Sequence, residues 1–266
     1  MNDSVYEILS TISEAEKAAA GLMLHAQGTL AEIKTSRRDV VTEYDRRVQQ
    51  MLVRRLRDAV PTAHFFCEEK NVQENLKAEH VFIIDPIDGT MNFVHNMHHS
   101  CISVAYMSYG VILAASVYNP YTDEMFTAAK GSGAFINGRP IRVENTPLSD
   151  SLFCLGSAPY EPQLADETFR LARIAYDASL DLRRFASAEL DLCAVAAGRA
   201  GLYFELSVSF WDYAAGSLIL TEAGGVCSTI DGASLPLDGR KTSILAGNRQ
   251  AYKDFAALIA PVKEEK

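Results

Sequence analysis

Acidic side chains in three separated segments are the residues whose types and spacing could do chemistry in this sequence. Glu68 follows a loop, Asp85 and Asp88 follow a short apolar run, and Asp212 comes directly after Trp211. Hard cations such as Mg²⁺ take oxygen ligands, usually one or two carboxylates each together with waters and substrate phosphate. Carboxylates brought together from three segments could hold two or three such ions and give an acidic protein a locally positive site for phosphate.

Taken one at a time, these acidic residues also fit purely structural roles. The pair Glu68-Glu69 is typical of a solvated surface. Asp212 could cap a helix by accepting from first-turn N–H groups. Asp85-Pro86 could form a turn, because proline fixes φ and lacks an N–H donor. The chemical interpretation therefore depends on whether these residues act together.

The run from Asp85 to Thr90 is harder to explain by structure alone. A rigid proline separates Asp85 from Asp88, so both carboxylates can turn toward one point beyond the end of the strand. Gly89 lets the backbone come close to a ligand. Thr90 supplies a hydroxyl near an expected helix start, where backbone N–H groups bind phosphate oxygens well. This run favours a metal-assisted phosphate site.

Apolar spacing predicts the elements that would position these residues. A helical period runs through residues 3–30 and again through 39–58. The apolar run 81–84 predicts a buried strand that stops at Asp85-Pro86. Residues 101–107 and 111–118 predict two strands joined by a tight turn.

The second half of the chain mixes strands and helices. Asn137-Gly138 is a strong hairpin signal between the short strands expected at 134–136 and 140–143. Further elements are expected as helices over 161–176, 187–199 and 212–223, and as a strand over 202–206. This order predicts an α+β layered sandwich rather than a regular βαβ alternation.

Composition narrows the classes of function. The chain has 266 residues, and 34 acidic against 25 basic side chains give a net charge of −9. Broad binding to nucleic acid or to an anionic membrane requires a basic surface, so neither partner is expected. No apolar run approaches the ~18–20 residues that a membrane span needs. The N-terminal residues have neither the basic nor the apolar region of a signal peptide.

Cysteine usage bears on the compartment. The five cysteines are scattered, odd in number and never paired as C-x-x-C, which disfavours structural zinc and a disulfide framework: Cys67, Cys101, Cys154, Cys193 and Cys227. We expect reduced cysteines that pack as small hydrophobic residues. The expected location is the cytoplasm.

The order of the motifs resembles the inositol monophosphatase family, within a superfamily of lithium-sensitive, magnesium-dependent phosphatases that includes fructose bisphosphatases. The resemblance rests on residues 68–69, 85–93 and 211–216. Supporting matches lie at 39–45, 131–143, Glu205 and 221–225, so the resemblance covers about residues 5–260. It implies a single inositol monophosphatase-like catalytic domain over residues 1–266, a layered αβαβα sandwich, and a homodimer.

The resemblance also implies a ligand set for Mg²⁺. Glu68, Asp85 and the backbone carbonyl of Ile87 would bind the first ion. Asp85, Asp88 and Asp212 would bind the second, and Glu68 with water would serve a weaker third. The expected cofactor is thus two to three Mg²⁺ ions per subunit.

Catalytic roles follow from the same resemblance. Backbone N–H groups of Gly89 and Thr90 would hold phosphate. Thr90, with Asp45 behind it, would orient and help deprotonate the attacking water, and Glu68 counts with them as catalytic. Metal coordination would do most of this work by lowering the pKa of water. Phosphate ester hydrolysis suits the arrangement, because its transition state spreads charge over the equatorial oxygens.

The resemblance assigns the substrate contacts to Asp88, Gly89, Thr90, Ala186, Ser187, Glu205 and Asp212. Glu205 matches the family residue that hydrogen-bonds a substrate hydroxyl. Ala186 stands where the family commonly has glycine, Glu189 follows close by, and Cys67 replaces the usual glycine before Glu68. These departures remove no metal ligand, but they predict a narrower and more acidic pocket for the leaving group.

The function predicted from the sequence is a Mg²⁺-dependent phosphomonoesterase that acts on inositol monophosphates or related sugar and polyol phosphates, with Li⁺ as an inhibitor. One alternative keeps the chemistry and changes the substrate to fructose 1,6-bisphosphate, a 3′-phosphoadenosine nucleotide or NADP. Another alternative is a non-catalytic partner protein in a transcription complex.

Overall fold

Seven strands from the first half of the chain form one sheet, in the order β3-β4-β5-β6-β7-β8-β9. The computed structural model describes residues 3–26, 31–36, 39–69 and 74–264. β3 and β4 pair in parallel, and the other neighbours pair antiparallel. The strands are β3 (His64–Cys67), β4 (Val81–Asp88), β5 (Cys101–Ser108), β6 (Val111–Asn119), β7 (Glu124–Ala129), β8 (Ala134–Ile136) and β9 (Arg139–Ile141).

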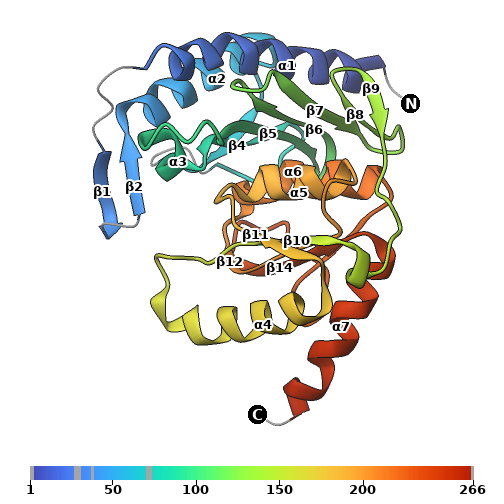
Figure 1. Ribbon diagram of the computed structural model, residues 1–266. Helices are drawn as coiled ribbons and strands as arrows, with labels where there is room; N and C mark the ends of the chain where they lie inside the picture. The colour runs from blue at the N-terminus through green and yellow to red at the C-terminus, as the bar shows by residue number, and fades with distance from the viewer. Residues whose placement is uncertain (1–2, 27–30, 37–38, 70–73, 265–266) are drawn as a thin grey trace.

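A second sheet of five strands lies below the first in Figure 1, in the order β11-β10-β12-β14-β13. β10 runs parallel to β11 and β12, whereas β14 runs antiparallel to β12 and β13. The strands are β10 (Leu152–Leu155), β11 (Asp181–Arg183), β12 (Leu202–Val208), β13 (Val226–Ser228) and β14 (Thr242–Gly247). A separate hairpin is formed by β1 (Ala31–Ser36) and β2 (Asp39–Thr42).

Helices cover and separate the two sheets, which confirms the predicted αβαβα sandwich (Figure 1). The first sheet is covered on its outer face by α1 (Asp3–Leu24) and α2 (Glu43–Ala59). Between the sheets lie α5 (Ala188–Ala196) and α6 (Ala214–Glu222). The second sheet is covered by α4 (Ala165–Ala178) and α7 (Arg249–Glu264). The remaining helical turns are α3 (Thr90–Val94), η1 (Leu148–Asp150), η2 (Pro162–Leu164) and η3 (Phe210–Asp212).

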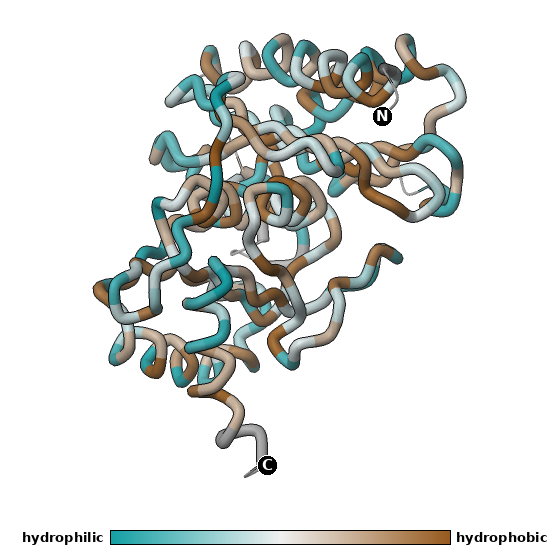
Figure 2. Tube along the Cα trace, turned by 90° about the vertical axis from the view of Figure 1, so that its right-hand side faces the viewer, coloured by the Kyte–Doolittle hydropathy of each residue, from teal (hydrophilic) through white to brown (hydrophobic). Residues whose placement is uncertain are grey.

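Hydrophobic patterning explains the layers. Most residues of α5 and α6 are buried, because these helices pack between the two sheets. Helices α1, α2 and α4 bury one face and expose the other. In Figure 2 these outer helices alternate hydrophobic and hydrophilic residues along the tube. One buried cluster joins α1 and α2 to the first sheet, and another joins α4 and α7 to the second. A third surrounds the middle helices and includes residues of both sheets.

Several predicted elements differ in their bounds. The helix expected over 39–58 starts as strand β2, because the Thr42 side chain caps α2 by accepting from the N–H groups of Tyr44 and Asp45. The first helix ends at Leu24, and the predicted part at 27–30 lies outside the described residues. β4 does not stop at Asp85 but continues to Asp88, with an irregular register against β5 in between.

The C-terminal helices are also shorter than expected. The predicted helix 161–176 begins at Ala165 after the turn η2, and the one over 187–199 ends at Ala196. Asp212 belongs to η3, so it precedes α6 instead of starting it.

All five cysteines carry free thiols, and four of them are buried. Within the described part of the chain, no helix is both long and apolar enough to cross a membrane.

Candidate active site

The parallel pairing of β3 with β4 brings two acidic residues to the same edge of the first sheet. Cys67 lies opposite Ile84 in the register, and the Glu68 N–H donates to the Ile84 carbonyl at 3.1 Å. Glu68 and Asp85 therefore follow directly from neighbouring points on the two strands. Parallel strands end at one edge, which is why residues 17 positions apart meet there (85 − 68).

The N-terminal ends of α5 and α6 supply the opposite side of the site. Ser187 is the N-cap of α5, and its hydroxyl donates to Asp88 Oδ2 at 2.6 Å. The Glu189 N–H donates to the same oxygen at 2.8 Å. Asp212, on η3, accepts from the Ser209 N–H at 2.7 Å. Asp88 thus joins the first sheet to α5, and Ser187 contributes a bond to Asp88 in addition to any contact with substrate.

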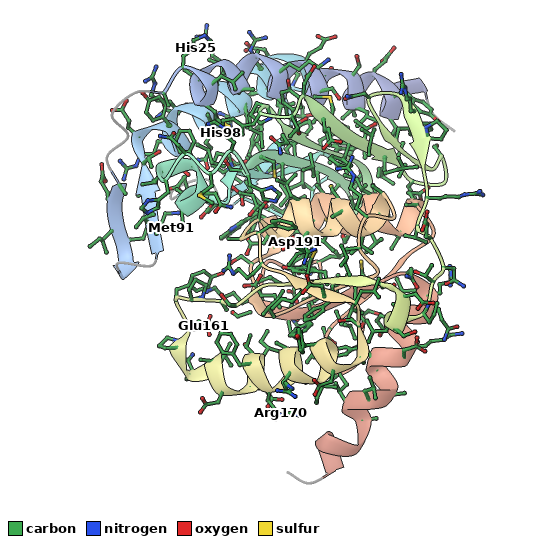
Figure 3. The ribbon with its side chains drawn as sticks, viewed as in Figure 1. His25, Met91, His98, Glu161, Arg170 and Asp191 are labelled. Carbon is green, nitrogen blue, oxygen red and sulfur yellow. The ribbon has the colours of Figure 1, made fainter. Side chains whose placement is uncertain are left out.

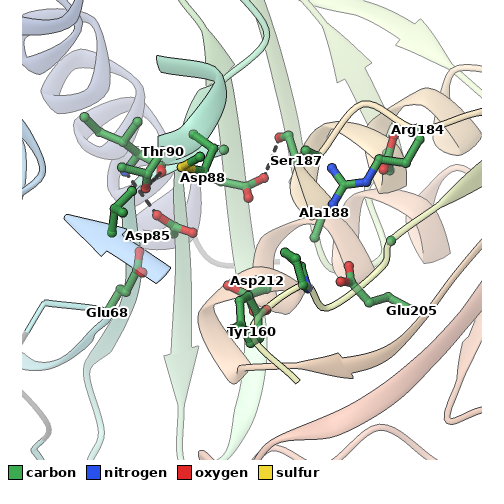
Figure 4. A pocket seen from close by; sticks show the side chains of 18 residues that line it. Glu68, Asp85, Asp88, Thr90, Tyr160, Arg184, Ser187, Ala188, Glu205 and Asp212 are labelled. Carbon is green, nitrogen blue, oxygen red and sulfur yellow. Dashed lines mark hydrogen bonds between the residues drawn. The ribbon is translucent and has the colours of Figure 1, made fainter. Parts of the chain in front are cut away.

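These residues surround one cavity of about 400 Å³. Of the site residues predicted from the sequence, all except Asp45 line it. The cavity lies where both sheets and the middle helices meet: Figure 3 marks Met91 on α3 and Asp191 on α5, which line it from different layers. The side chains seen in Figure 4 include Glu68, Asp85, Asp88, Thr90, Tyr160, Arg184, Ser187, Glu205 and Asp212.

The carboxylates of the cavity repel one another. Burial raises the pKa of Asp85 well above its usual value, and Glu68, Asp88 and Asp212 raise it further. Burial also raises the pKa of Asp212, as do the nearby Glu68 and Asp88, while the Ser209 N–H lowers it. Burial raises the pKa of Asp88 to about 6, although Ser187 and Glu189 donate to it. Such a set of oxygen ligands fits a hard divalent cation, whose charge would offset this repulsion.

Lys34 provides the one positive charge that contacts Glu68 in the described residues. Its Nζ lies 2.8 Å from Glu68 Oε1 and 2.5 Å from Glu69 Oε1. Burial alone would lower the Lys34 pKa, but the two glutamates raise it above its usual value. No three His, Cys, Asp or Glu side chains of the described residues are already arranged as a complete ligand set. Lys34 therefore offsets part of the negative charge at this edge of the cavity.

Thr90 and Asp45 are in contact, as the sequence predicts. The Thr90 hydroxyl lies 3.2 Å from Asp45 Oδ1 and 3.1 Å from the Ile87 carbonyl, and it can donate to either. Asp45 Oδ2 accepts from both the N–H and the hydroxyl of Thr42. Burial raises the pKa of Asp45 to about 7, against the opposing effect of the Thr42 hydroxyl. Asp45 is therefore a buried base held behind Thr90.

Glu205 forms part of the cavity wall. Its Oε1 accepts from the Ala158 N–H at 2.7 Å, and its Oε2 accepts from the Tyr203 hydroxyl at 2.9 Å. Gly156 leaves it space, because a Cβ there would lie 1.9 Å from Glu205 Oε2. Each carboxylate oxygen can accept a second hydrogen bond. Glu205 can therefore hold the loop at 156–160 and still receive a substrate hydroxyl.

Comparison with known proteins shows which family the chain belongs to. The sequence model of the inositol monophosphatase family matches residues 2–265. The chain belongs to the inositol monophosphatase family. The "Inositol-1-monophosphatase" of Rhizobium meliloti is 37% identical over 227 residues, which cover 83% of each chain. The "Putative Nus factor SuhB" of Neisseria meningitidis is 36% identical over 256 residues, which cover 95% of this chain and 97% of that protein.

The fold agrees with the family as well. The structure of an inositol monophosphatase from Anabaena superposes with a TM-score of 0.86 at 30% identity, and the match covers 97% of each chain. The layered α+β sandwich of this chain is thus an inositol monophosphatase fold.

Two residues that line the cavity, Gly89 and Ala186, have left-handed backbone conformations. Gly89 has a φ of +86°, and a Cβ there would lie 3.1 Å from the carbonyl oxygens of Ala186 and His99. Ala186 itself has a φ of +64°, in the left-handed region. Glycine adopts that region readily, whereas alanine does so at a cost of roughly 1 kcal/mol.

Some residues of the site were not singled out by sequence reasoning. Lys34 carries no local signal, because it meets Glu68 only through folding of the β1–β2 hairpin. Tyr160 lines the cavity from an irregular loop. Tyr203 could have been found, because it lies two residues before Glu205 on β12 and alternate residues of a strand share a face.

Proposed function

We propose that this protein is a Mg²⁺-dependent phosphomonoesterase that hydrolyses inositol monophosphates or related sugar and polyol phosphates. The single observation that carries the proposal is the convergence of Glu68, Asp85, Asp88 and Asp212 on one cavity, with Thr90 and its base beside them. We propose further that the whole chain, 1–266, acts as a single catalytic domain, because the cavity takes residues from both sheets.

The residues that would hold two to three Mg²⁺ ions are those of the acidic cluster. Glu68, Asp85 and the Ile87 carbonyl would take the first ion, and Asp85, Asp88 and Asp212 the second. Glu68 would also serve a weaker third. The chemistry that Mg²⁺ supplies when bound is neutralisation of phosphate charge and a lowered pKa for water.

The chain's own groups would orient the reactants. Gly89 and Thr90 line the cavity, and their N–H groups would donate to phosphate oxygens. By donating its own proton to Asp45, the Thr90 hydroxyl leaves its lone pairs to accept from the attacking water. Asp45, with a pKa of about 7, can accept that proton near neutral pH. The predicted proton path is therefore from water through Thr90 to Asp45.

The far end of the cavity bears on the substrate. Glu205 offers acceptors to a polyol hydroxyl, and Tyr160 lines the cavity beside it. Of the residues that line the cavity, Arg184 is the basic one, and its Nη2 donates to Ser157 Oγ at 2.9 Å. A second phosphate would find little positive charge there. This favours inositol and polyol monophosphates over fructose 1,6-bisphosphate, 3′-phosphoadenosine nucleotides or NADP.

The test is release of phosphate from a panel of inositol, sugar and nucleotide phosphates, with Mg²⁺ and with EDTA. We expect Mg²⁺-dependent turnover that is largest on an inositol or polyol monophosphate. The matched control is Asp88→Asn, which removes a ligand charge but little volume and should abolish most turnover. Addition of Li⁺ should inhibit the wild type. Absence of phosphate release on every substrate of the panel would contradict the proposal.

A second candidate function has one observation in its favour, the name "Nus factor" given to the Neisseria relative. In that case the chain would work as a non-catalytic partner in a transcription complex. The test separates the two: a binding protein would release no phosphate, whereas a phosphatase releases it whatever else it binds. The acidic cavity favours the phosphatase.

A further inference from the structure

Glu189 is a fully buried glutamate whose side chain faces the middle of the molecule rather than solvent. It is the second residue of α5 and has no exposed surface. Three groups donate to its carboxylate: the Ser103 hydroxyl at 3.0 Å, the Ala215 N–H at 3.2 Å and the Gly216 N–H at 2.5 Å. Through these hydrogen bonds, the Glu189 carboxylate connects α5 to strand β5 and to helix α6.

Each of these three contacts leads to an acidic residue of the cavity. Ser103, on β5, lies directly opposite Asp85 in the register of the first sheet. Ala215 and Gly216 form the first turn of α6, which begins two residues after Asp212. The Glu189 backbone N–H itself donates to Asp88 Oδ2 at 2.8 Å. A single residue thus connects the segments that carry Asp85, Asp88 and Asp212.

The fit around Glu189 is close. A Cβ on Gly216 would lie 2.5 Å from Glu189 Oε2, so the first turn of α6 can approach the carboxylate only with glycine at this position. The neighbours of Glu189 on α5 are mostly apolar, and apolar packing alone would hold the helix between the sheets. A buried carboxyl group is unfavourable unless hydrogen bonds satisfy it. Its presence here calls for a reason other than core packing.

We propose that Glu189 is a positioning residue, which sets the spacing of the Asp85, Asp88 and Asp212 segments so that their carboxylates can share divalent cations. The inference rests on the proposed function, since it concerns how the metal site is built. Glu189 does not line the cavity itself, and it acts through the groups that it holds. Partners behind metal ligands of this kind typically change metal affinity by about 10- to 100-fold.

The experiment compares Glu189→Gln with two further variants of the full chain. Glutamine keeps the size but offers only one oxygen, so at least one of the two α6 N–H groups loses its acceptor. Ser103→Ala removes only the contact with β5 and leaves the contacts with α6. The matched control is Glu16→Gln, because Glu16 is also fully buried and accepts from a serine, Ser116, on the opposite face of the same sheet.

The readouts are Mg²⁺ binding by isothermal titration calorimetry and thermal unfolding in EDTA. We expect the Kd for Mg²⁺ to rise about 10-fold or more in Glu189→Gln and about 3-fold in Ser103→Ala. In Glu16→Gln it should stay within about 2-fold of the wild-type value, because that contact leads to no metal ligand. Saturating Mg²⁺ should restore much of kcat in Glu189→Gln, a recovery that a merely structural role does not predict.

The outcomes are distinguishable. If the wild type binds no Mg²⁺, the proposed function fails and the inference fails with it. If the wild type binds Mg²⁺ and both Glu189→Gln and Ser103→Ala bind it equally well, the inference alone is wrong. If Glu189→Gln does not fold, Ser103→Ala decides, because loss of one hydroxyl leaves the core packing intact. A lowered melting temperature with an unchanged Kd would also assign Glu189 a structural role only.

Discussion

At the scale of single residues, Thr90 has the most specific predicted role. Its hydroxyl sits between the buried Asp45 carboxylate and the cavity. In Thr90→Ala the attacking water loses its orienting group, and positioned proton transfer typically contributes ~10²–10⁴-fold to rate. We expect kcat to fall by about that factor, with the KM little changed. Steady-state kinetics on the preferred substrate measures it, and a loss confined to KM would contradict the role.

Glu205 tests the substrate class at the same scale. Glu205→Gln keeps the Ala158 and Tyr203 contacts largely satisfied but weakens the acceptor offered to a substrate hydroxyl. We expect kcat/KM for inositol monophosphates to fall by about 10-fold, because a site built to hydrogen-bond a substrate hydroxyl loses selectivity when its acceptor is weakened. Hydrolysis of p-nitrophenyl phosphate, which has no such hydroxyl, serves as the control and should change little. Equal losses on both substrates would show that Glu205 only supports the loop at 156–160.

At the scale of elements, helix α1 packs a glutamate against the first sheet. Glu16 has no exposed surface, and its Oε2 accepts from the Ser116 hydroxyl on β6. Among the residues that the structure describes, its Oε1 has no hydrogen-bond partner. Burial raises the pKa of Glu16 well above its usual value, the Ser116 contact lowers it, and repulsion from Glu189 raises it further. The folded state therefore binds this proton more tightly than the unfolded state does.

The pH dependence of stability follows from that difference. As the pH rises above about 4.5, the unfolded chain loses the Glu16 proton first, so the free energy of unfolding falls until the pH exceeds the folded-state pKa. Glu16→Gln does not titrate. Its stability relative to the wild type should improve as the pH rises from 5 to 8, by up to about 1.4 kcal/mol per pH unit.

Urea unfolding at several pH values measures this effect. Glu7→Gln, which changes an exposed glutamate of the same helix, is the matched control and should show no such trend. A difference between Glu16→Gln and the wild type that stays constant across this range of pH would mean that Glu16 does not carry a raised pKa in the folded protein.

At the scale of the whole molecule, the cavity joins the two sheets through the middle helices. Its acidic residues repel one another in the buried site, so bound cations should stabilise the fold as a unit. At a Mg²⁺ concentration 100 times the Kd, binding contributes about 2.7 kcal/mol. For a chain of this size we expect Tm to rise by roughly 6 °C relative to EDTA.

Thermal unfolding with Mg²⁺ and with EDTA checks this expectation. Asp88→Asn should lose most of the rise while unfolding at nearly the same temperature in EDTA. We also expect one cooperative transition, since a single core cluster joins both sheets through α5 and α6. Two separate transitions would contradict the proposal that residues 1–266 form a single domain.

Much of this protein could be predicted from the sequence because the relevant signals are local. The layered α+β class follows from apolar spacing and turn residues, which report the face that each segment buries. The residues from Asp85 to Thr90 are six consecutive positions, and Asp212 follows directly on Trp211. Motifs made of consecutive residues can be recognised in the sequence without the structure. The bounds of β2 and β4 could not be predicted in this way, because capping by Thr42 and pairing with β5 decided them.

Only the tertiary structure decided which residues support the site. Lys34 reaches Glu68 from the β1–β2 hairpin, Ser187 donates to Asp88 from 99 positions away, and Glu189 binds Ser103 from 86 positions away. Contacts of this kind depend on how strands and helices pack, and the residues adjacent in the sequence do not indicate them. The metal ligands stand out in the sequence because their chemistry restricts the residue type. Their supporting residues do not, since many side chains could satisfy the same hydrogen bond, and packing alone selects one.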